Sequence, residues 1–527
     1  MKKWNNYRSD LTNESFDAII VGSGIGGLTT AALLALNGKR VLILEKHFKI
    51  GGWTHTFRRD NYEWDVGIHY IGDVHKPWSL VRRLFDLVSD GQLKWSPMDA
   101  NYDRIIFPDQ AYNFTAPREQ FLEDMISYFP MEENALKTYM ALIDKAVKNS
   151  KPYFTNKAMP DLMGRITYPF MTRKFFQLAD RTTYDVLSEL TDNDEMIGVL
   201  TGQWGDHGLP PKRSSFAMHA LVVRHYLDGG NYPTGSSRSI AETISTLIEK
   251  QGGKLAVNAA VDEIIINKGS AVGVRLASGD ELNAETIISS TGVMNTYEKL
   301  ISSKQLPSSI PASLQTVQKT ESYICLHIGL NRSAKDLGLK NTNLWIYPGY
   351  DHDQNVENFR QDPDADFPVV YISFPSAKDE AWEQEHAGYA TMEAITMSKW
   401  DWYGKWQEKP WKKRGEEYEN EKEKLSTRIM DVVHRHVPGI KEAVDYMELS
   451  TPLTIRDLAN YQQGEMYGVY HTPQRFRQRW LKPRTKIKNL FLTGQDVTTA
   501  GVTSALFSGL LTASAVLNKN LTNMIKS

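Results

Sequence analysis

The N-terminal region alternates between apolar and glycine-rich positions in the order of a βαβ unit. Residues 18–21 form an apolar run that ends at Gly22, and an Ala/Leu-rich stretch follows it. A second apolar run covers residues 41–44 and ends at Glu45. Short apolar runs bounded by glycine indicate buried parallel strands, and the stretch between them has the length of a crossover helix.

The glycines of this unit have the spacing of a dinucleotide-binding turn. Gly22 permits a tight turn, Gly24 allows a pyrophosphate to approach the backbone, and Gly27 lets the helix lie close to the strand. A carboxylate at Glu45 can accept from both hydroxyls of an adenosine ribose, and it repels a 2′-phosphate, which disfavours NADP. The contacts predicted from this unit are Gly22, Ser23, Gly24, Gly26, Gly27, Glu45 and Lys46.

Two later apolar segments also predict buried elements. Residues 322–330 read SYICLHIGL, which predicts a buried strand that contains Cys325. Residues 501–517 are apolar but are interrupted by Thr, Ser and Gly, whereas a lipid-spanning helix needs about 20 mostly apolar positions. We therefore expect a buried helix at residues 501–517.

Three separated segments together have the pattern of one nucleotide-binding domain. The first segment covers residues 16 to about 75. The second, residues 229–292, has a helix pattern followed by short strands and turns, and the third, residues 489–517, has an apolar strand followed by the 501–517 helix. The intervening segments are rich in Trp, Tyr and Phe. We expect an α/β fold, with a Rossmann-type domain built from residues 1–85, 225–300 and 450–527, and an α+β substrate domain built from residues 86–224 and 301–449.

Composition excludes several classes of partner and site. The net charge is −2 and 24% of residues are charged, so a nucleic-acid partner is not expected. Cys325 is the only cysteine, which excludes disulfide chemistry and thiolate metal clusters. No third ligand accompanies His434 and His436, and no metal is expected. The N-terminus has lysines but no apolar signal segment, so the expected location is the cytoplasm.

The residues after Glu45 distinguish FAD from NAD. Gly51 and Gly52 let the chain pass close to a ligand, and Trp53 and Thr54 follow them. A domain that binds only NAD has no evident use for this extension. The ribityl chain and isoalloxazine of FAD, in contrast, reach well beyond the adenosine half. The sequence therefore favours FAD as the cofactor.

A second wall for the same cofactor is predicted near the C-terminus. The apolar strand in NLFLTGQD ends at Gly494 and Asp496, and the next helix begins near Val502 and Thr503. Asp496 can accept a hydrogen bond from a ribityl hydroxyl. The positive end of the helix suits the flavin N1/C2 carbonyl region, where negative charge collects on reduction.

Several longer motifs carry a resemblance to one family. They are GGWTHTF, DVGIHYIG, SSFAMHALVVRHYLDGGNYPTGSS, MNTYEKL, FPSAKDEAWE and LTGQDV. In these motifs the chain resembles the FAD-dependent phytoene desaturase and carotenoid isomerase family. The resemblance implies an FAD-binding domain of the glutathione-reductase and amine-oxidase type, with the backbone of Val261 at the adenine and Asp496 at the ribityl chain.

The resemblance also implies chemistry on a hydrophobic, retinol-like or carotenoid-like polyene. Reduced flavin would deliver a hydride to one carbon of a C=C bond, and an acid would protonate the other. Saturation is the first hypothesis; desaturation, redox-neutral cis-trans isomerisation and non-catalytic flavin or lipid binding stay open. With only one GxGxxG motif, the electron donor stays open between NAD(P)H bound transiently and an external electron carrier. The candidate acids are His69, Tyr70, His207, His219 and Tyr467.

Two segments have the mixed aromatic and basic composition of a membrane-surface element. They are residues 400–414 and residues 473–486, where Phe476 and Trp480 stand among Arg and Lys. A long polyene is nearly insoluble in water, so we expect peripheral membrane association. A basic surface loop without lipid contact is the alternative reading of these residues.

Overall fold

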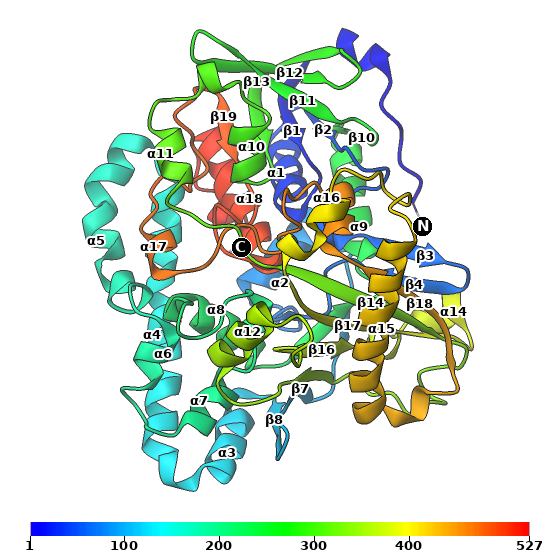
Figure 1. Ribbon diagram of the computed structural model, residues 1–527. Coiled ribbons are helices and arrows are strands. Elements are labelled where there is room, and N and C mark those ends of the chain that lie inside the picture. Colours follow the sequence, from blue (N-terminus) through cyan, green and yellow to red (C-terminus); the bar gives the residue numbers. More distant parts are fainter. Residues whose placement is uncertain (1, 526–527) are drawn as a thin grey trace.

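The first of two large sheets has a parallel centre of the kind that binds nucleotides. The computed structural model describes residues 2–525, and two seven-stranded sheets form its framework (Figure 1). The first sheet has the order β10-β2-β1-β13-β12-β11, with β19 paired to β13, and the pairs that join β10, β2, β1, β13 and β19 are parallel. Its strands are β1 (Phe16–Val21), β2 (Val41–Leu44), β10 (Lys254–Ala256), β11 (Val261–Asn267), β12 (Ser270–Leu276), β13 (Glu281–Ser289) and β19 (Leu490–Leu492).

Helices from three distant segments pack together beside this sheet. The helix α1 (Ile25–Leu36) contacts both α9 (Arg238–Lys250) and α18 (Val502–Leu517), and all but the last of its residues are buried. The predicted βαβ unit is confirmed, although β1 begins earlier than predicted, at Phe16. The buried helix predicted at residues 501–517 is confirmed as α18.

The second sheet is largely antiparallel and has the order β18-β14-β17-β16-β15-β7-β8. The strand predicted at residues 322–330 is β14, which lies inside this sheet between β18 and β17. Only β15 and β7 pair in parallel. The strands are β7 (Asn101–Ile106), β8 (Ala111–Thr115), β14 (Ser322–Leu330), β15 (Asn343–Ile346), β16 (Val370–Ser373), β17 (Ala390–Ser398) and β18 (Val444–Ser450).

Two small sheets and a group of helices complete the described part of the chain. The strands β3 (Thr56–Arg59) and β4 (Tyr62–Asp65) form a hairpin, and β5 (Ile71–Gly72), β9 (Gly230–Pro233) and β6 (Trp95–Pro97) form a three-stranded sheet. The longer helices outside the first sheet are α2 (Leu80–Val88), α3 (Arg118–Tyr128), α4 (Glu133–Ala158), α5 (Asp161–Ala179), α7 (Asp194–Leu200), α8 (Phe216–Tyr226), α12 (His352–Gln361), α15 (Glu416–His436) and α16 (Pro452–Ala459).

The two large sheets draw on alternating stretches of the sequence. The first takes its strands from residues 16–44, 254–289 and 490–492, and the second from residues 101–115, 322–398 and 444–450. The fold is therefore mixed α/β with a discontinuous Rossmann-type unit, as predicted. None of the helices between residues 2 and 525 combines the length and apolarity needed to cross a membrane.

Candidate active site

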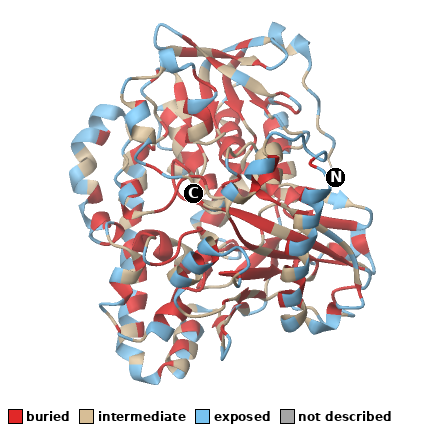
Figure 2. Cartoon of the chain, in the orientation of Figure 1, coloured by how far each residue is buried: buried red, intermediate tan, exposed pale blue. Residues whose placement is uncertain are grey.

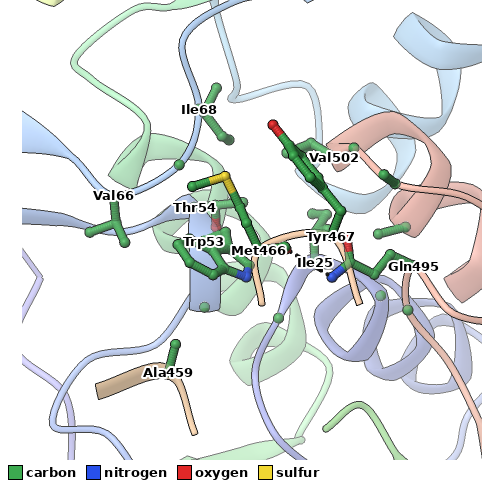
Figure 3. A pocket seen from close by; sticks show the side chains of 18 of the residues that line it. Ile25, Trp53, Thr54, Val66, Ile68, Ala459, Met466, Tyr467, Gln495 and Val502 are labelled. Atoms are coloured by element: carbon green, nitrogen blue, oxygen red, sulfur yellow. Dashed lines mark hydrogen bonds between the residues drawn. The ribbon is translucent and has the colours of Figure 1, made fainter. Parts of the chain in front are cut away.

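A cavity of about 1510 Å³ is lined by elements of both large sheets. Figure 3 shows part of it, with Trp53, Met466 and Tyr467 around the space and Val502 of α18 beside Tyr467. Most residues predicted from the sequence line this one cavity. They are Gly22, Ser23, Gly24, Gly26, Glu45, Lys46, Gly52, Trp53, Thr54, His69, Tyr70, Val261, Tyr467, Gly494, Asp496, Val502 and Thr503.

The glycine turn after β1 has three geometrically different positions. Gly22 has φ +91°, which L side chains rarely adopt. A Cβ on Gly27 would lie 2.5 Å from the carbonyl oxygen of Gly22, so only glycine lets α1 approach β1 this closely. A Cβ on Gly24 would meet nothing nearer than Ser290 Oγ at 3.7 Å, and Gly24 lines the cavity. Gly24 therefore leaves free space beside the helix N-terminus.

Two helix N-termini open into the same cavity. The N-cap residue of α1 is Gly24 and that of α18 is Gly501, and neither helix has a side-chain cap. Their first turns line the cavity at Ile25 and at Val502. Uncapped N–H groups and the positive ends of two adjacent helix dipoles favour anionic groups of a ligand at this position.

The Glu45 carboxylate is held in place by hydrogen bonds to the glycine turn after β1. Its Oε2 accepts from Ser23 N at 2.8 Å and from Ser23 Oγ at 2.6 Å, and its Oε1 accepts from His47 N at 2.8 Å. Ser23 Oγ in turn accepts from Gly51 N at 3.0 Å. Gly51 does not line the cavity, so its contribution is to hold the 51–54 segment against the turn.

Asp496 is a buried carboxylate that organises three segments at the cavity wall. It accepts from Val293 N at 2.9 Å and from Val469 N at 3.2 Å. Burial raises the pKa of Asp496 above its ordinary value, and these backbone hydrogen bonds and Arg475 oppose the shift. Asp496 therefore holds the first residue of α10 (Val293–Glu298) and the backbone at Val469 beside the cavity.

These features fit a bound FAD. The open backbone at Gly24 and the uncapped end of α1 would hold the pyrophosphate, and Glu45 lies beside them for the ribose. The uncapped end of α18 and Asp496 would face the flavin half. Gly27 and Gly51 support the site from outside the cavity.

A buried acid contacts two histidines next to the cavity. Glu393 in β17 is fully buried; its Oε2 lies 3.1 Å from His69 Nδ1, and its Oε1 lies 3.4 Å from His327 Nδ1. Burial alone would raise the pKa of Glu393, but the two imidazoles outweigh it and keep that pKa below its ordinary value. His69 lines the cavity, and its Nε2 makes no hydrogen bond within residues 2–525. The Glu393 carboxylate therefore faces the Nδ1 side of the His69 ring.

Two further buried ionisable groups surround this pair. Lys378 Nζ donates to the carbonyl oxygen of His69 at 2.9 Å and to Ser373 Oγ at 2.7 Å, and burial lowers the Lys378 pKa to about 7. Burial and the nearby Glu393 charge raise the Asp65 pKa to about 8.

The other predicted acids differ in how their polar atoms are used. Tyr70 OH donates to Asp103 Oδ2 at 2.9 Å and lies 3.2 Å from Asp206 Oδ2. Its hydroxyl is therefore already hydrogen-bonded within the protein. Tyr467 extends into the cavity (Figure 3). His219 and His207 are buried and do not line the cavity, and burial lowers both pKa values to about 3.

Sequence reasoning missed Glu393, Lys378 and Asp65. Glu393 is the one charged residue in the apolar strand ATMEAITMS, and a lone acid in a buried strand is a signal for a functional group. Lys378 stands inside the motif FPSAKDEAWE but was given no role. The contact between residues 69 and 393 could not be read from the sequence.

Comparisons with known proteins agree with this geometry. A family model described as flavin containing amine oxidoreductase matches residues 25–517. The chain is 34% identical to an all-trans-retinol 13,14-reductase of Danio rerio over 96% of this chain and 87% of that protein. It is 25% identical to prolycopene isomerase 2 of an Oncidium hybrid cultivar over 95% and 84%. A solved structure of putrescine oxidase superposes with a TM-score of 0.63 at 16% identity, covering 96% of this chain and 100% of that chain, which shows the shared fold.

Proposed function

This chain belongs to the flavin-containing amine oxidoreductase family, and from that premise we propose that it is an FAD-dependent reductase that saturates a C=C bond of a hydrophobic polyene. The relative named as a retinol reductase supports this substrate class, because the similarity covers nearly the whole chain. The substrate would be retinol-like or carotenoid-like.

One observation carries the proposal: the cavity that fits FAD also contains His69 with a buried carboxylate behind it. The cavity runs from Gly24 and the end of α1 to residues of the second sheet such as Tyr371 and Ile395. Its exposed lining is mostly apolar, which suits a long hydrocarbon. A nucleotide site, an apolar chamber and a side chain able to donate a proton are the parts that reduction of a polyene requires.

His69, Glu393 and Lys378 have separate roles in the proposed reaction. When bound and reduced, FAD supplies a hydride to one carbon of the double bond. His69 would hold a proton on Nε2 for the other carbon, and Glu393 would stabilise the charged imidazole through Nδ1. Lys378 fixes the backbone of His69 through its carbonyl oxygen. The apolar walls would exclude water from a bound polyene.

The second candidate function is redox-neutral cis-trans isomerisation. The similarity to a prolycopene isomerase over 95% of this chain favours it over desaturation. The same cavity and the same acid would serve, because transient protonation or reduction of a polyene also lowers the barrier to rotation about its double bonds. A non-catalytic flavin or lipid carrier stands as the third candidate.

The electron donor in the proposal is NAD(P)H, bound transiently. The chain has one glycine fingerprint, at Gly22 to Gly27, and FAD occupies it in this scheme. A nicotinamide would therefore approach the flavin through the cavity rather than rest in a domain of its own.

The mass of the product distinguishes these functions. Reduced holoenzyme is incubated without oxygen with retinol and, separately, with a cis-carotenoid, and the products are analysed by mass spectrometry. The proposal expects a gain of two hydrogens. A parallel anaerobic incubation with oxidised holoenzyme tests the reverse reaction, and a loss of two hydrogens there indicates a desaturase. An altered retention time at constant mass with the reduced enzyme indicates an isomerase. Unchanged polyene under every donor condition would leave the carrier as the correct reading.

A further inference from the structure

The outer face of α5 exposes large apolar side chains to solvent. Leu162 is 72% exposed, Met163 54%, Ile166 62% and Phe170 83%. With 3.6 residues per turn, these four side chains fall within an arc of about 100° on one side of the helix. The opposite side, which includes Gly164 and Phe175, is buried. The exposed positions follow α5 along the left edge of the molecule in Figure 2.

Cationic side chains border this apolar stripe. Arg165, Arg173 and Lys174 of α5 are exposed, and none of them forms an ion pair with any residue from 2 to 525. The first residue of the helix, Asp161, is neutralised by Lys482 at 2.6 Å. We call these exposed residues of α5 the α5 face: Leu162, Met163, Arg165, Ile166, Phe170, Arg173 and Lys174.

Further arginines extend the positive charge beside the helix. The guanidinium of Arg477 lies 3.7 Å from the ring centroid of Phe176, and that of Arg479 lies 4.2 Å from the centroid of Tyr168. Arg477 also pairs with Asp180, with Nε 2.8 Å from Oδ1. The basic segment predicted to bind a membrane thus lies against α5, but it contributes cations rather than the apolar contact.

Part of the two segments that the sequence singled out for membrane contact is packed into the protein. Arg475 is buried and donates to the carbonyl oxygens of Gln495 and Asp496, and Phe476 is buried beside it. In residues 400–414, Trp406 and Arg414 are buried as well. These four side chains are therefore not available to a membrane, whereas Trp411, Arg477 and Arg479 of the same segments are exposed, and membrane contact by these segments stays a prediction.

The helix α4 connects the α5 face to the cavity. It packs along α5, and its residues Val147, Lys151 and Phe154 line the cavity. The cavity wall also includes Trp78, which is 71% exposed. The cavity therefore reaches the helix that packs against α5.

We propose that the α5 face docks the protein on a lipid bilayer that contains anionic headgroups, with α5 lying flat in the interface. Four large apolar side chains on one helix face, bordered by unpaired cations, are the pattern of an interfacial amphipathic helix. The docking itself stands on the α5 face, whereas its purpose, collection of an apolar polyene, rests on the proposed function. Vesicle binding and turnover are measured separately, so failure of one does not hide failure of the other.

The test is flotation of the purified flavoprotein with vesicles. Vesicles are made of phosphatidylcholine alone or with 30% phosphatidylglycerol, a composition chosen for the assay, and are used at about 50 mM salt, where surface charges are weakly screened. We expect flotation with the anionic vesicles. The variant Leu162→Ser, Met163→Ser, Ile166→Ser, Phe170→Ser should lower the partition coefficient roughly a hundred-fold or more, because it removes four apolar side chains from the interface. Arg165→Gln, Arg173→Gln, Lys174→Gln should lower it by about five-fold for each cation, on anionic vesicles only.

Two controls keep the outcome decisive. Met131 is 93% exposed but stands on a short 3-10 turn away from α5, so Met131→Ser should leave flotation unchanged. Because the four stripe residues are exposed, their variant should keep the melting temperature and flavin content of wild type. Unchanged flotation of that variant overturns the proposal. So does a wild-type protein that stays off vesicles and sediments as a dimer which the same variant splits, since the face would then bind a second copy.

Discussion

At the scale of single residues, a substitution of Gly24 is expected to weaken cofactor binding without disturbing the fold. A Cβ there would have ordinary contact distances to protein atoms, and the residue has φ −59°, which any residue adopts. Gly24→Val should therefore fold normally but fill the space next to the uncapped end of α1. We expect at least a ten-fold weaker affinity for FAD, measured by flavin fluorescence titration, with an unchanged melting temperature of the apoprotein.

Gly27→Ala is the matched control for that substitution. Its Cβ would lie 2.5 Å from the Gly22 carbonyl oxygen, so α1 would have to move away from β1. We expect a loss of about 1–3 kcal/mol in the free energy of unfolding of the apoprotein. If Gly24→Val were the more destabilising of the two, the glycine roles assigned to this turn would be reversed.

His69 and Glu393 give the second residue-scale prediction. His69→Gln should lower the rate of polyene reduction by about 10²–10⁴-fold, because a positioned general acid contributes that much, while flavin content stays constant. Glu393→Gln keeps the volume but removes the charge behind Nδ1. Its activity should survive at low pH, and the descending limb of the pH profile should move to lower pH, since the imidazolium loses its counter-ion.

A merely structural role for Glu393 would give a different result. Activity would then fall equally at every pH, and the position of the limb would match that of wild type. Steady-state rates across pH 5 to 9, recorded with the His327→Gln variant as a control beside Glu393→Gln, separate the two outcomes.

At the scale of elements, Asp496 links the start of α10 to the cofactor wall. Its carboxylate accepts from Val293 N at the start of α10 and from Val469 N. Asp496→Ala leaves both buried N–H groups without a partner, which should cost about 1–3 kcal/mol in the unfolding free energy of the apoprotein. Asp496→Asn retains one acceptor and should recover part of it. Equal stability of wild type and the Ala variant in urea would refute this role.

Elements defined by local pattern were predictable from the sequence. The strand at residues 41–44, the helix at residues 501–517 and the strand at residues 322–330 each follow from an apolar run with clear ends. The acid behind His69 was not predictable, because it depends on β17 lying next to a loop more than three hundred residues earlier in the chain. Arg475 shows the opposite error: a local basic pattern indicated a surface, but tertiary packing buried the residue.

At the scale of the whole molecule, several buried neutral histidines make stability depend on pH. Burial lowers the pKa of His207 and His219 to about 3 and that of His225 and His352 to about 4. Unfolded histidines titrate near 6.5, so between about pH 4 and 6.5 the unfolded state binds more protons than the folded state. Stability should therefore fall as the pH falls through this window, by about 1.4 kcal/mol per pH unit for each such histidine.

Urea denaturation at pH 7.0 and at pH 5.0 measures this loss. His219→Gln can keep the contact with Tyr139 OH but cannot take up a proton, so its stability should fall less between the two pH values. A variant with the same pH dependence as wild type would show that His219 is not one of the groups responsible.

In the proposed reaction, a flavin, an apolar polyene and the proton donor His69 share one cavity that is lined by residues of both large sheets, and the polyene accepts the electrons. The most direct measurement is an anaerobic single-turnover titration, in which retinol is added to photoreduced holoenzyme while flavin and polyene absorbance are followed together. We predict that the oxidised flavin spectrum returns as one double bond is lost per flavin, and that His69→Gln slows both changes equally. A flavin that stays reduced while the polyene spectrum is unchanged, for retinol and carotenoids alike, would contradict the account.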